Sequence, residues 1–320
     1  MIRASLLCVA ALLTLGSGSA LAAFPGRPGP IAYERTKIRD LGGGENFYDG
    51  GITSRSATRG ARRRQLTVSI SDGEPSYSAN GRRLIYTSFS ERSELNGIYH
   101  VNFRGRQKRE TRALGDSPSY FPSGRRILFA RKDEDGFSHI YSARANGTRI
   151  RQLTFGPFHD SEPAVSPSGR RVLFVSDRNG AAGGTDIYTM RANGSGIGVL
   201  IAGAGTEAGP DFAPGGNRIA FSSSRGRGPS NIFVARADGS GVRRLTRCVS
   251  VPGCPAYSHP SFSPRGRRIA VLSSTASSSA IVVIRSDRRR PPLITVDSGS
   301  VDEAGAGIVL GPPAWGPRPR

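Results

Sequence analysis

The stretch Glu74–Ser88 reads EPSYSANGRRLIYTS, and its pattern returns four more times along the chain without gaps. Each copy opens on a residue followed by proline, passes through a turn that contains glycine, and ends on a short apolar run. The other copies are SPSYFPSGRRILFAR (Ser117–Arg131), EPAVSPSGRRVLFVS (Glu162–Ser176), GPDFAPGGNRIAFSS (Gly209–Ser223) and HPSFSPRGRRIAVLS (His259–Ser273). Such repetition indicates an array of similar structural units.

The leading proline of each copy gives the spacing of the repeat. These prolines are Pro75, Pro118, Pro163, Pro210 and Pro260, and a partial copy begins at Pro313, so the spacings are 43, 45, 47, 50 and 53 residues. Each unit predicts four short strands, and Asn-Gly or Asp-Gly turns between apolar runs favour hairpins before the fourth. Four strands in 40 to 50 residues are typical of a propeller blade, which predicts an all-β propeller with four-stranded antiparallel blades.

The two ends of the chain complement each other. The last copy supplies only a first strand around Ala314–Gly316, whereas PIAYERT (Pro30–Thr36) resembles a second strand and RRRQLT (Arg62–Thr67) resembles a fourth. Pairing the termini in one blade would close the ring and remove exposed sheet edges. We therefore expect residues 23–320 to form one six-bladed domain, with the count open by one blade if Gly42–Gly51 holds a further strand.

Composition narrows the class of protein. The 320 residues include 42 glycines and 22 prolines, which disfavour an all-helical bundle, and 37% are hydrophobic, enough for a core.

The apolar stretch Leu6–Leu15 follows Arg3 and precedes Ala20-Leu21-Ala22, which predicts a signal peptide over residues 1–22 with cleavage after Ala22. The alternative, a retained membrane anchor, is disfavoured by the short apolar stretch. We expect an exported, periplasmic, envelope-associated or secreted protein with no transmembrane segment after cleavage.

Two of the three cysteines lie close together outside the predicted signal. Cys248 and Cys254 enclose the segment VSVPG, and a close pair in an exported chain favours a disulfide. A metal site is the alternative, but no histidine or second cysteine pair stands at ligand spacing.

The repeat resembles the WD-repeat-like propeller repeats of the TolB family. That family's blade reads P-x-aromatic-S-P-D-G-basic-basic-I-x-F, and the match covers roughly Glu74 to Leu310. The turns here read SANG, FPSG, SPSG, APGG and SPRG, without the family's aspartate. TolB itself carries an α/β domain before its propeller, so the resemblance implies a propeller-only relative.

The formal net charge of +21 raises the question of nucleic-acid binding. GRR turns recur once per blade (for example Arg125-Arg126 and Arg170-Arg171), so these arginines should ring the disc rather than form one stripe. No base-stacking motif accompanies them, and no specific nucleic-acid partner is expected. Attraction to an anionic polymer or surface remains compatible with the charge.

Acidic residues and histidines gather ahead of the leading prolines. If these segments are innermost strands, their side chains converge at one mouth of the central channel, as a ligand, acid–base or metal site requires. The alternative is that the carboxylates satisfy backbone groups. The candidate residues are Asp72, Glu74, Asp116, His159, Asp160, Glu162, Glu207 and His259.

Two functions follow from these features. The first is a non-catalytic, monomeric binding or scaffold module for an envelope or extracellular protein or an anionic polymer, with no cofactor. The second is a carbohydrate-active enzyme, a lyase or hydrolase, with a divalent cation at the channel mouth. Oligogalacturonate lyases have a similar propeller and bind metal through histidines and a glutamine, but this chain has four histidines and no equivalent glutamine. No G-x-S-x-G nucleophile motif is present, and no catalytic residue is assigned.

Overall fold

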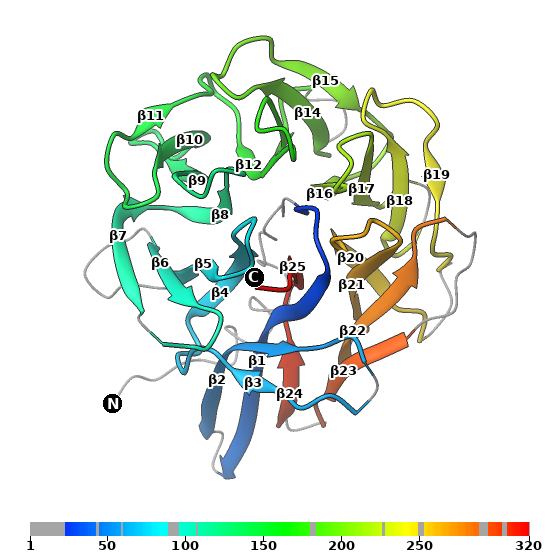
Figure 1. Ribbon diagram of the computed structural model, residues 1–320. Coiled ribbons are helices and arrows are strands. Elements are labelled where there is room, and N and C mark those ends of the chain that lie inside the picture. The colour runs from blue at the N-terminus through cyan, green and yellow to red at the C-terminus, as the bar shows by residue number, and fades with distance from the viewer. Residues whose placement is uncertain are drawn as a thin grey trace.

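The computed structural model is a ring of six antiparallel sheets around a central channel (Figure 1). It describes residues 23–42, 45–58, 60–88, 96–106, 108–179, 184–225, 228–248, 253–287, 294–302 and 306–319. The predicted signal peptide, residues 1–22, lies outside these ranges. No helix with the length and hydropathy needed to cross a bilayer occurs in them.

Five blades come from consecutive stretches of the chain, each with its first strand innermost. The first blade contains β4 (Asp72–Tyr77), β5 (Arg83–Ser88), β6 (Gly97–Asn102) and β7 (Arg109–Leu114). The second contains β8 (Asp116–Tyr120), β9 (Arg126–Lys132), β10 (Ser138–Arg144) and β11 (Arg151–Gln152). The third contains β12 (Asp160–Val165), β13 (Arg171–Ser176), β14 (Asp186–Arg191) and β15 (Gly198–Ile201). The fourth contains β16 (Glu207–Phe212), β17 (Arg218–Ser223), β18 (Asn231–Arg236) and β19 (Arg243–Arg244), and the fifth β20 (Ala256–Phe262), β21 (Arg268–Ser274), β22 (Ser278–Arg285) and β23 (Ile294–Ser300).

The sixth blade joins the two ends of the chain, which confirms the predicted closure. Its outer strands are β1 (Pro28–Gly42), β2 (Glu45–Arg55) and β3 (Arg64–Gln65), and its inner edge is β24 (Gly307–Leu310) and β25 (Ala314–Pro317). Both C-terminal strands pair antiparallel with β1, and Ala32 lies opposite Ala314. Within the glycine-rich stretch, Glu45–Gly51 belong to β2, which pairs with β1 in this same blade and adds no further blade, so the count is six.

Trp315 secures this closure. Its indole is 4% exposed and packs with Ile31 and Tyr33 of β1 and with residues of the fifth blade. Its backbone N–H donates to Ser261 Oγ at 3.0 Å, and its Nε1–H donates to the Gly29 carbonyl at 3.1 Å. One side chain therefore links the C-terminal strand, the N-terminal strand and the neighbouring blade.

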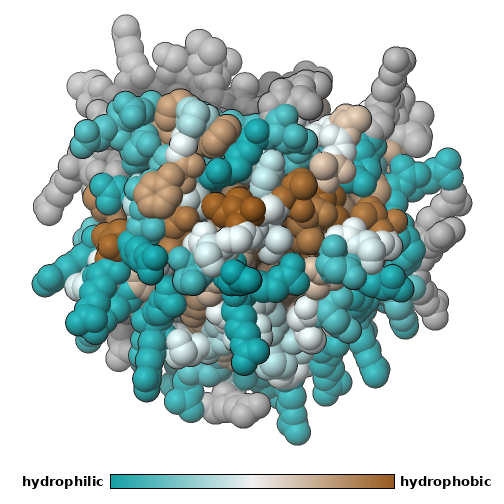
Figure 2. All heavy atoms as spheres, turned by 90° about the horizontal axis from the view of Figure 1, so that it is seen from above, coloured by the Kyte–Doolittle hydropathy of each residue, from teal (hydrophilic) through white to brown (hydrophobic). Residues whose placement is uncertain are grey.

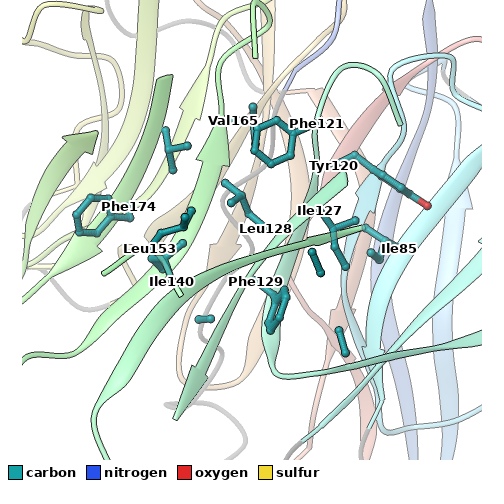
Figure 3. Packing of buried hydrophobic residues seen from close by; sticks show 14 of the residues in the cluster. Ile85, Tyr120, Phe121, Ile127, Leu128, Phe129, Ile140, Leu153, Val165 and Phe174 are labelled. Carbon is teal, nitrogen blue, oxygen red and sulfur yellow. The ribbon is translucent and has the colours of Figure 1, made fainter. Parts of the chain in front are cut away.

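The apolar runs of the repeat pack between blades. Ile127, Leu128 and Phe129 of β9 are fully buried, and they share one cluster with Ile85 of the first blade and Phe174 of the third (Figure 3). In four of the five blades, the aromatic residue at the end of this run also packs against one in the next strand, which explains the recurring I-Y and I-F pairs. The pairs are Tyr86–Tyr99, Phe129–Tyr141, Phe174–Tyr188 and Phe221–Phe233, with ring centroids 5.6 to 5.8 Å apart.

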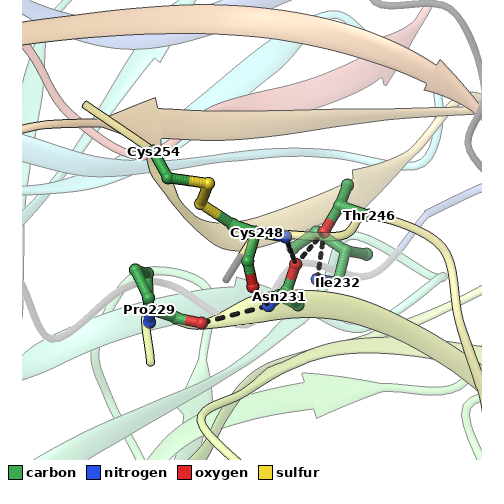
Figure 4. The surroundings of a disulfide bond; sticks show 6 residues. All are labelled: Pro229, Asn231, Ile232, Thr246, Cys248 and Cys254. Atoms are coloured by element: carbon green, nitrogen blue, oxygen red, sulfur yellow. Dashed lines mark hydrogen bonds between the residues drawn. A yellow bond between two sulfur atoms is a disulfide. The ribbon is translucent and has the colours of Figure 1, made fainter. Parts of the chain in front are cut away.

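The disulfide predicted from the cysteine spacing is present. Cys248 and Cys254 are bonded in the connection between the fourth and fifth blades (Figure 4). Asn231 holds the start of this loop: its Oδ1 accepts from the Cys248 N–H at 2.7 Å, and its Nδ2 donates to the Cys248 carbonyl at 3.1 Å.

The closure predicts a large effect of Trp315→Ala. Emptying this buried site should cost about 4 kcal/mol and lower the melting temperature by about 10 °C. Trp315→Phe keeps most of the packing and should cost about half as much or less. Circular dichroism melting measures both variants, and deletion of residues 312–320 removes β25 altogether. Unchanged melting after that deletion would mean that the ring does not depend on the pairing.

The disulfide predicts a smaller, redox-dependent contribution. Closing a loop of about seven residues stabilises the folded chain by about 2 kcal/mol. In urea unfolding, a reducing agent should therefore lower the midpoint of the wild-type chain. The double variant Cys248→Ala/Cys254→Ala should match the reduced wild type and show no response to reductant. A response in the double variant would assign the effect to something other than this bond.

Candidate functional site

Each innermost strand of the first five blades bends at the residue before its leading proline. These residues have positive φ: Glu74, Ser117, Glu162 and His259 at 51° and Gly209 at 59°. The pairing register with the second strand shifts at the same place. The sixth blade has Pro312 there, and because proline cannot adopt positive φ, its inner edge is split into β24 and β25.

The bend directs backbone N–H groups of one blade toward a carboxylate of the preceding blade. Glu74 Oε2 accepts from the Ser117 N–H at 2.6 Å, and Glu162 Oε2 accepts from the Gly209 N–H at 2.5 Å. Glu34 Oε1 accepts from the Glu74 N–H at 2.8 Å, and burial raises the pKa of Glu34 despite that bond. The carboxylates at these bends thus hold neighbouring blades together.

The other predicted acids begin the innermost strands, and three of them, Asp72, Asp160 and Glu207, are paired within their own blades. Asp160 and Glu207 are fully buried, and Arg178 and Arg225 donate to them through both Nε and a terminal nitrogen. Arg178 also lies over Phe174, and Arg225 lies over both rings of the Phe221–Phe233 pair. In this way each charge has a partner and each arginine also contacts an aromatic ring of its blade.

Asp72 of the first blade and Asp116, which stands one aligned position later in the second blade, have weaker partners, and the partner of Asp116 comes from the first blade. Asp72 is paired with Lys108 Nζ at 3.6 Å, and Lys108 lies over Tyr99. Asp116 accepts from Asn96 Nδ2 at 2.5 Å, and burial raises the pKa of Asp116. A role of these four acids in ligand binding stays a prediction.

The two predicted histidines differ in environment. His159 is exposed, with its ring against Phe137, and His259 is partly buried beside Ser258 Oγ at 2.9 Å. The histidine that is buried beside a predicted acid is His139, which lies between Asp133 (2.9 Å) and Asp160 (3.9 Å).

Metal binding finds no ligand set in the described part of the chain. No group of three or more histidine, cysteine, aspartate or glutamate side chains is arranged to hold an ion there. No arrangement of ligands among these residues therefore supports a divalent cation at the channel mouth, and that cation stays a prediction.

At the end of the ring opposite these acids, the first and last described segments of the chain lie together. Ala23 and Phe24 are buried on different sides of the channel, Ala23 with residues of the fourth and fifth blades and Phe24 with residues of the second and third. The Arg318 N–H donates to the Arg27 carbonyl at 2.7 Å. Segments 25–27 and 317–319, with turns 78–80 and 122–124, line a cavity of about 710 Å³.

Arginines recur at the turn end of the blades, the end at which turns 78–80 and 122–124 line this cavity. At the turn end of four blades, the first residue of the second strand lies opposite the last residue of the third strand, and both are arginine. The pairs are Arg126–Arg144, Arg171–Arg191, Arg218–Arg236 and Arg268–Arg285. We call this surface, with Arg82, Arg125, Arg170 and Arg267 of the turns, the arginine face. Figure 2 shows the disc edge-on, with long hydrophilic side chains projecting from its lower side.

Most of these guanidinium groups are exposed, and carboxylates are few beside them. Arg171 and Arg218 are half-buried and the other six paired arginines are exposed. Arg285 is paired with Asp287 at 2.8 Å, and Asp238 accepts from Ser240. The arginine face is therefore strongly cationic.

Sequence reasoning found the acids but missed several of their partners. Arg178 and Arg225 stand two residues beyond aligned second strands, a column that the repeat alignment makes visible. The arginine pairs also recur at two aligned positions, the first residue of the second strand and the last residue of the third. Glu34 and Ala23 lie outside the five full copies of the repeat, so the alignment of those copies gave no signal for them.

Comparison with known proteins agrees with this architecture. Residues 60–184 match the family model described as the TolB beta propeller domain. An uncharacterized protein of Agrobacterium fabrum is 30% identical over 120 residues, which is 37% of this chain and 40% of that protein. The Tol-Pal system protein TolB of Bordetella pertussis is 28% identical over 107 residues, 33% of this chain and 24% of that protein. The matched stretches thus span less than half of either relative.

The solved structure of TolB from Acinetobacter baumannii superposes with a TM-score of 0.67 at 19% identity. The alignment covers 91% of this chain and 67% of that one, and at this identity it shows a shared fold. The repeat, the six closed blades and these matches together make the chain a TolB-like β-propeller protein.

Proposed function

We propose that the protein is an exported, non-catalytic binding module whose arginine face holds a polyanionic ligand of the cell envelope. The ligand class is a polymer or surface that carries several phosphates or carboxylates. The four cross-strand arginine pairs are the observation that carries this proposal. The TolB-like propeller supports a binding role of this general kind.

Electrostatics favours an anion on this face. Like charges directly opposite each other on neighbouring strands destabilise a sheet, yet four blades of one chain carry such a pair at the same position. Bound phosphates or carboxylates would relieve that repulsion and gain charge-assisted hydrogen bonds from the guanidinium groups. Arg27 and Arg318 line the cavity at the centre, where an anionic group could be held from two sides.

The surroundings of the channel acids support structural roles for them. Glu74 and Glu162 accept backbone hydrogen bonds, and Asp160 and Glu207 are paired with arginines. A general acid or base needs a carboxyl group that can reach its substrate. These contacts favour the binding module over the carbohydrate-active enzyme.

Replacing two arginine pairs should weaken polyanion binding and its salt dependence. The variant Arg126→Gln/Arg144→Gln/Arg171→Gln/Arg191→Gln removes up to four anion contacts, which should lower the slope of log K against log salt by about 3. Binding is measured by co-sedimentation with vesicles containing phosphatidylglycerol, and separately with polygalacturonate. The two ligands distinguish phosphate from carboxylate polymers, and product release from polygalacturonate tests the enzymatic alternative in the same samples.

The matched control removes the same charge elsewhere. Lys37, Arg39, Lys132 and Arg247 are exposed and lie outside the arginine face, so changing all four to glutamine should leave most of the binding intact. Equal loss in both variants would assign the attraction to net charge alone. Wild-type protein that binds neither ligand at low salt would contradict the proposal.

Substitution of Glu162 should affect stability and leave polyanion binding unchanged. Glu162→Ala leaves the buried Gly209 N–H without its acceptor and should cost about 2 kcal/mol in urea unfolding. Glu162→Gln keeps a carbonyl acceptor and should cost about half as much. Weaker binding in both variants, with the fold intact, would restore the channel mouth as the ligand site.

A further inference from the structure

Asp211 is a buried charge at a position that is uncharged in the other blades. It follows the leading Pro210 on β16 and has no exposed surface. Because only one of the six repeats carries a charge at this aligned position, the reason for the charge must lie in the surroundings of Asp211. The equivalent residues after the other leading prolines are Ser76, Ser119, Ala164, Ser261 and Ala314.

The carboxylate of Asp211 has hydrogen bonds but no cation. Its Oδ2 accepts from the Phe262 N–H at 2.7 Å, and its Oδ1 accepts from the Ala23 N–H at 3.2 Å. Within the described ranges, no lysine, arginine or histidine forms an ion pair with it, and burial raises its pKa well above the usual range. An ionised carboxylate that is buried without a counterion is strongly unfavourable.

The group that touches Asp211 is the residue at which the mature chain is expected to begin. Ala20-Leu21-Ala22 predicts cleavage before Ala23. Ala23 is 1% exposed and packs with Ala213 and Phe262, while Phe24 is anchored among residues of the second and third blades. The backbone nitrogen of Ala23 is thereby held inside the ring against the carboxylate.

We propose that hydrolysis of the Ala22–Ala23 bond creates the missing cation, and that the new α-ammonium of Ala23 forms a buried ion pair with Asp211. An endopeptidase that cuts after small residues adds water across the bond. Ala22 leaves as a carboxylate, and the Ala23 nitrogen becomes an amine that takes up a proton. An α-amino group is mostly protonated at neutral pH, and a carboxylate at hydrogen-bond distance favours that form further.

The ion pair gives leader removal a structural consequence. In the uncleaved chain, Ala23 offers Asp211 one amide hydrogen bond and no charge. After cleavage, the same nitrogen offers a full charge, which fixes the first residues of the mature chain in the channel. This inference rests on the expected cleavage site and is independent of polyanion binding at the arginine face.

Three forms of the mature chain test the ion pair: one that begins at Ala23, one that retains Ala22, and one acetylated at the Ala23 nitrogen. We expect the first to melt about 5 °C above the other two, because only it places a cation at Asp211. In Asp211→Asn, which keeps an oxygen acceptor, the three forms should melt within about 1 °C of one another. An undiminished difference in Asp211→Asn, or equal melting in the wild type, would overturn the proposal.

Chemical labelling of the α-amine gives a readout that does not depend on variant stability. The native protein is exported, purified and treated with an amine-reactive ester at neutral pH, and its N-terminal peptide is followed by mass spectrometry. The peptide should begin at Ala23, and its α-amine should react at least tenfold more slowly than in urea. A chain that begins elsewhere, or an α-amine that reacts equally fast when folded, would contradict the inference.

Discussion

The pairing of β25 with β1 is the constraint on which the rest of the structure depends. Five blades can each form from a continuous stretch of chain, but none of them closes the ring. Closure requires Ala314 to meet Ala32, and it places Trp315 among apolar residues of two blades. The sixth blade is also joined to the fifth through Asp297, which accepts from the Tyr33 hydroxyl at 2.8 Å. The place of the segments 23–27 and 317–319 and the arginine face both follow from this closed geometry.

Within the closed ring, the same backbone bend recurs at the inner edge of the blades. A residue with positive φ before a proline turns its N–H away from its own sheet, toward the neighbouring blade. Where the sequence has Glu74 or Glu162, the same residue also supplies a carboxylate for the next N–H. Buried backbone donors need acceptors, and here acidic side chains provide them where the sheet pairing is interrupted. Acidic residues before proline thus have a structural cause that does not require a ligand.

The sequence was sufficient for the fold because its signals repeat. Blade number and closure could be predicted, because a strand whose sequence is ambiguous in one copy of the repeat can be assigned from the aligned copies. The disulfide could be predicted from the short spacing of its two cysteines. The site was harder to predict, because the residue that pairs with each acid does not keep the same type and sequence position in every blade. Asp72, Asp160 and Glu207 share a position, yet their partners are Lys108, Arg178 and Arg225. Contacts from outside the repeat, such as those of Glu34 and Ala23, have no periodicity from which to infer them.

The register of Ala32 with Ala314 also determines when the molecule can finish folding. Bringing together residues about 280 positions apart costs about 5 kcal/mol of chain entropy, far more than any hairpin within a blade. Topologies dominated by such distant contacts fold slowly. In a chain that is synthesised from its N-terminus, β1 is therefore made long before β24 and β25, its inner neighbours. Until they are present, one edge of β1 has no strand to pair with, and an unpaired strand edge is prone to pair with another chain.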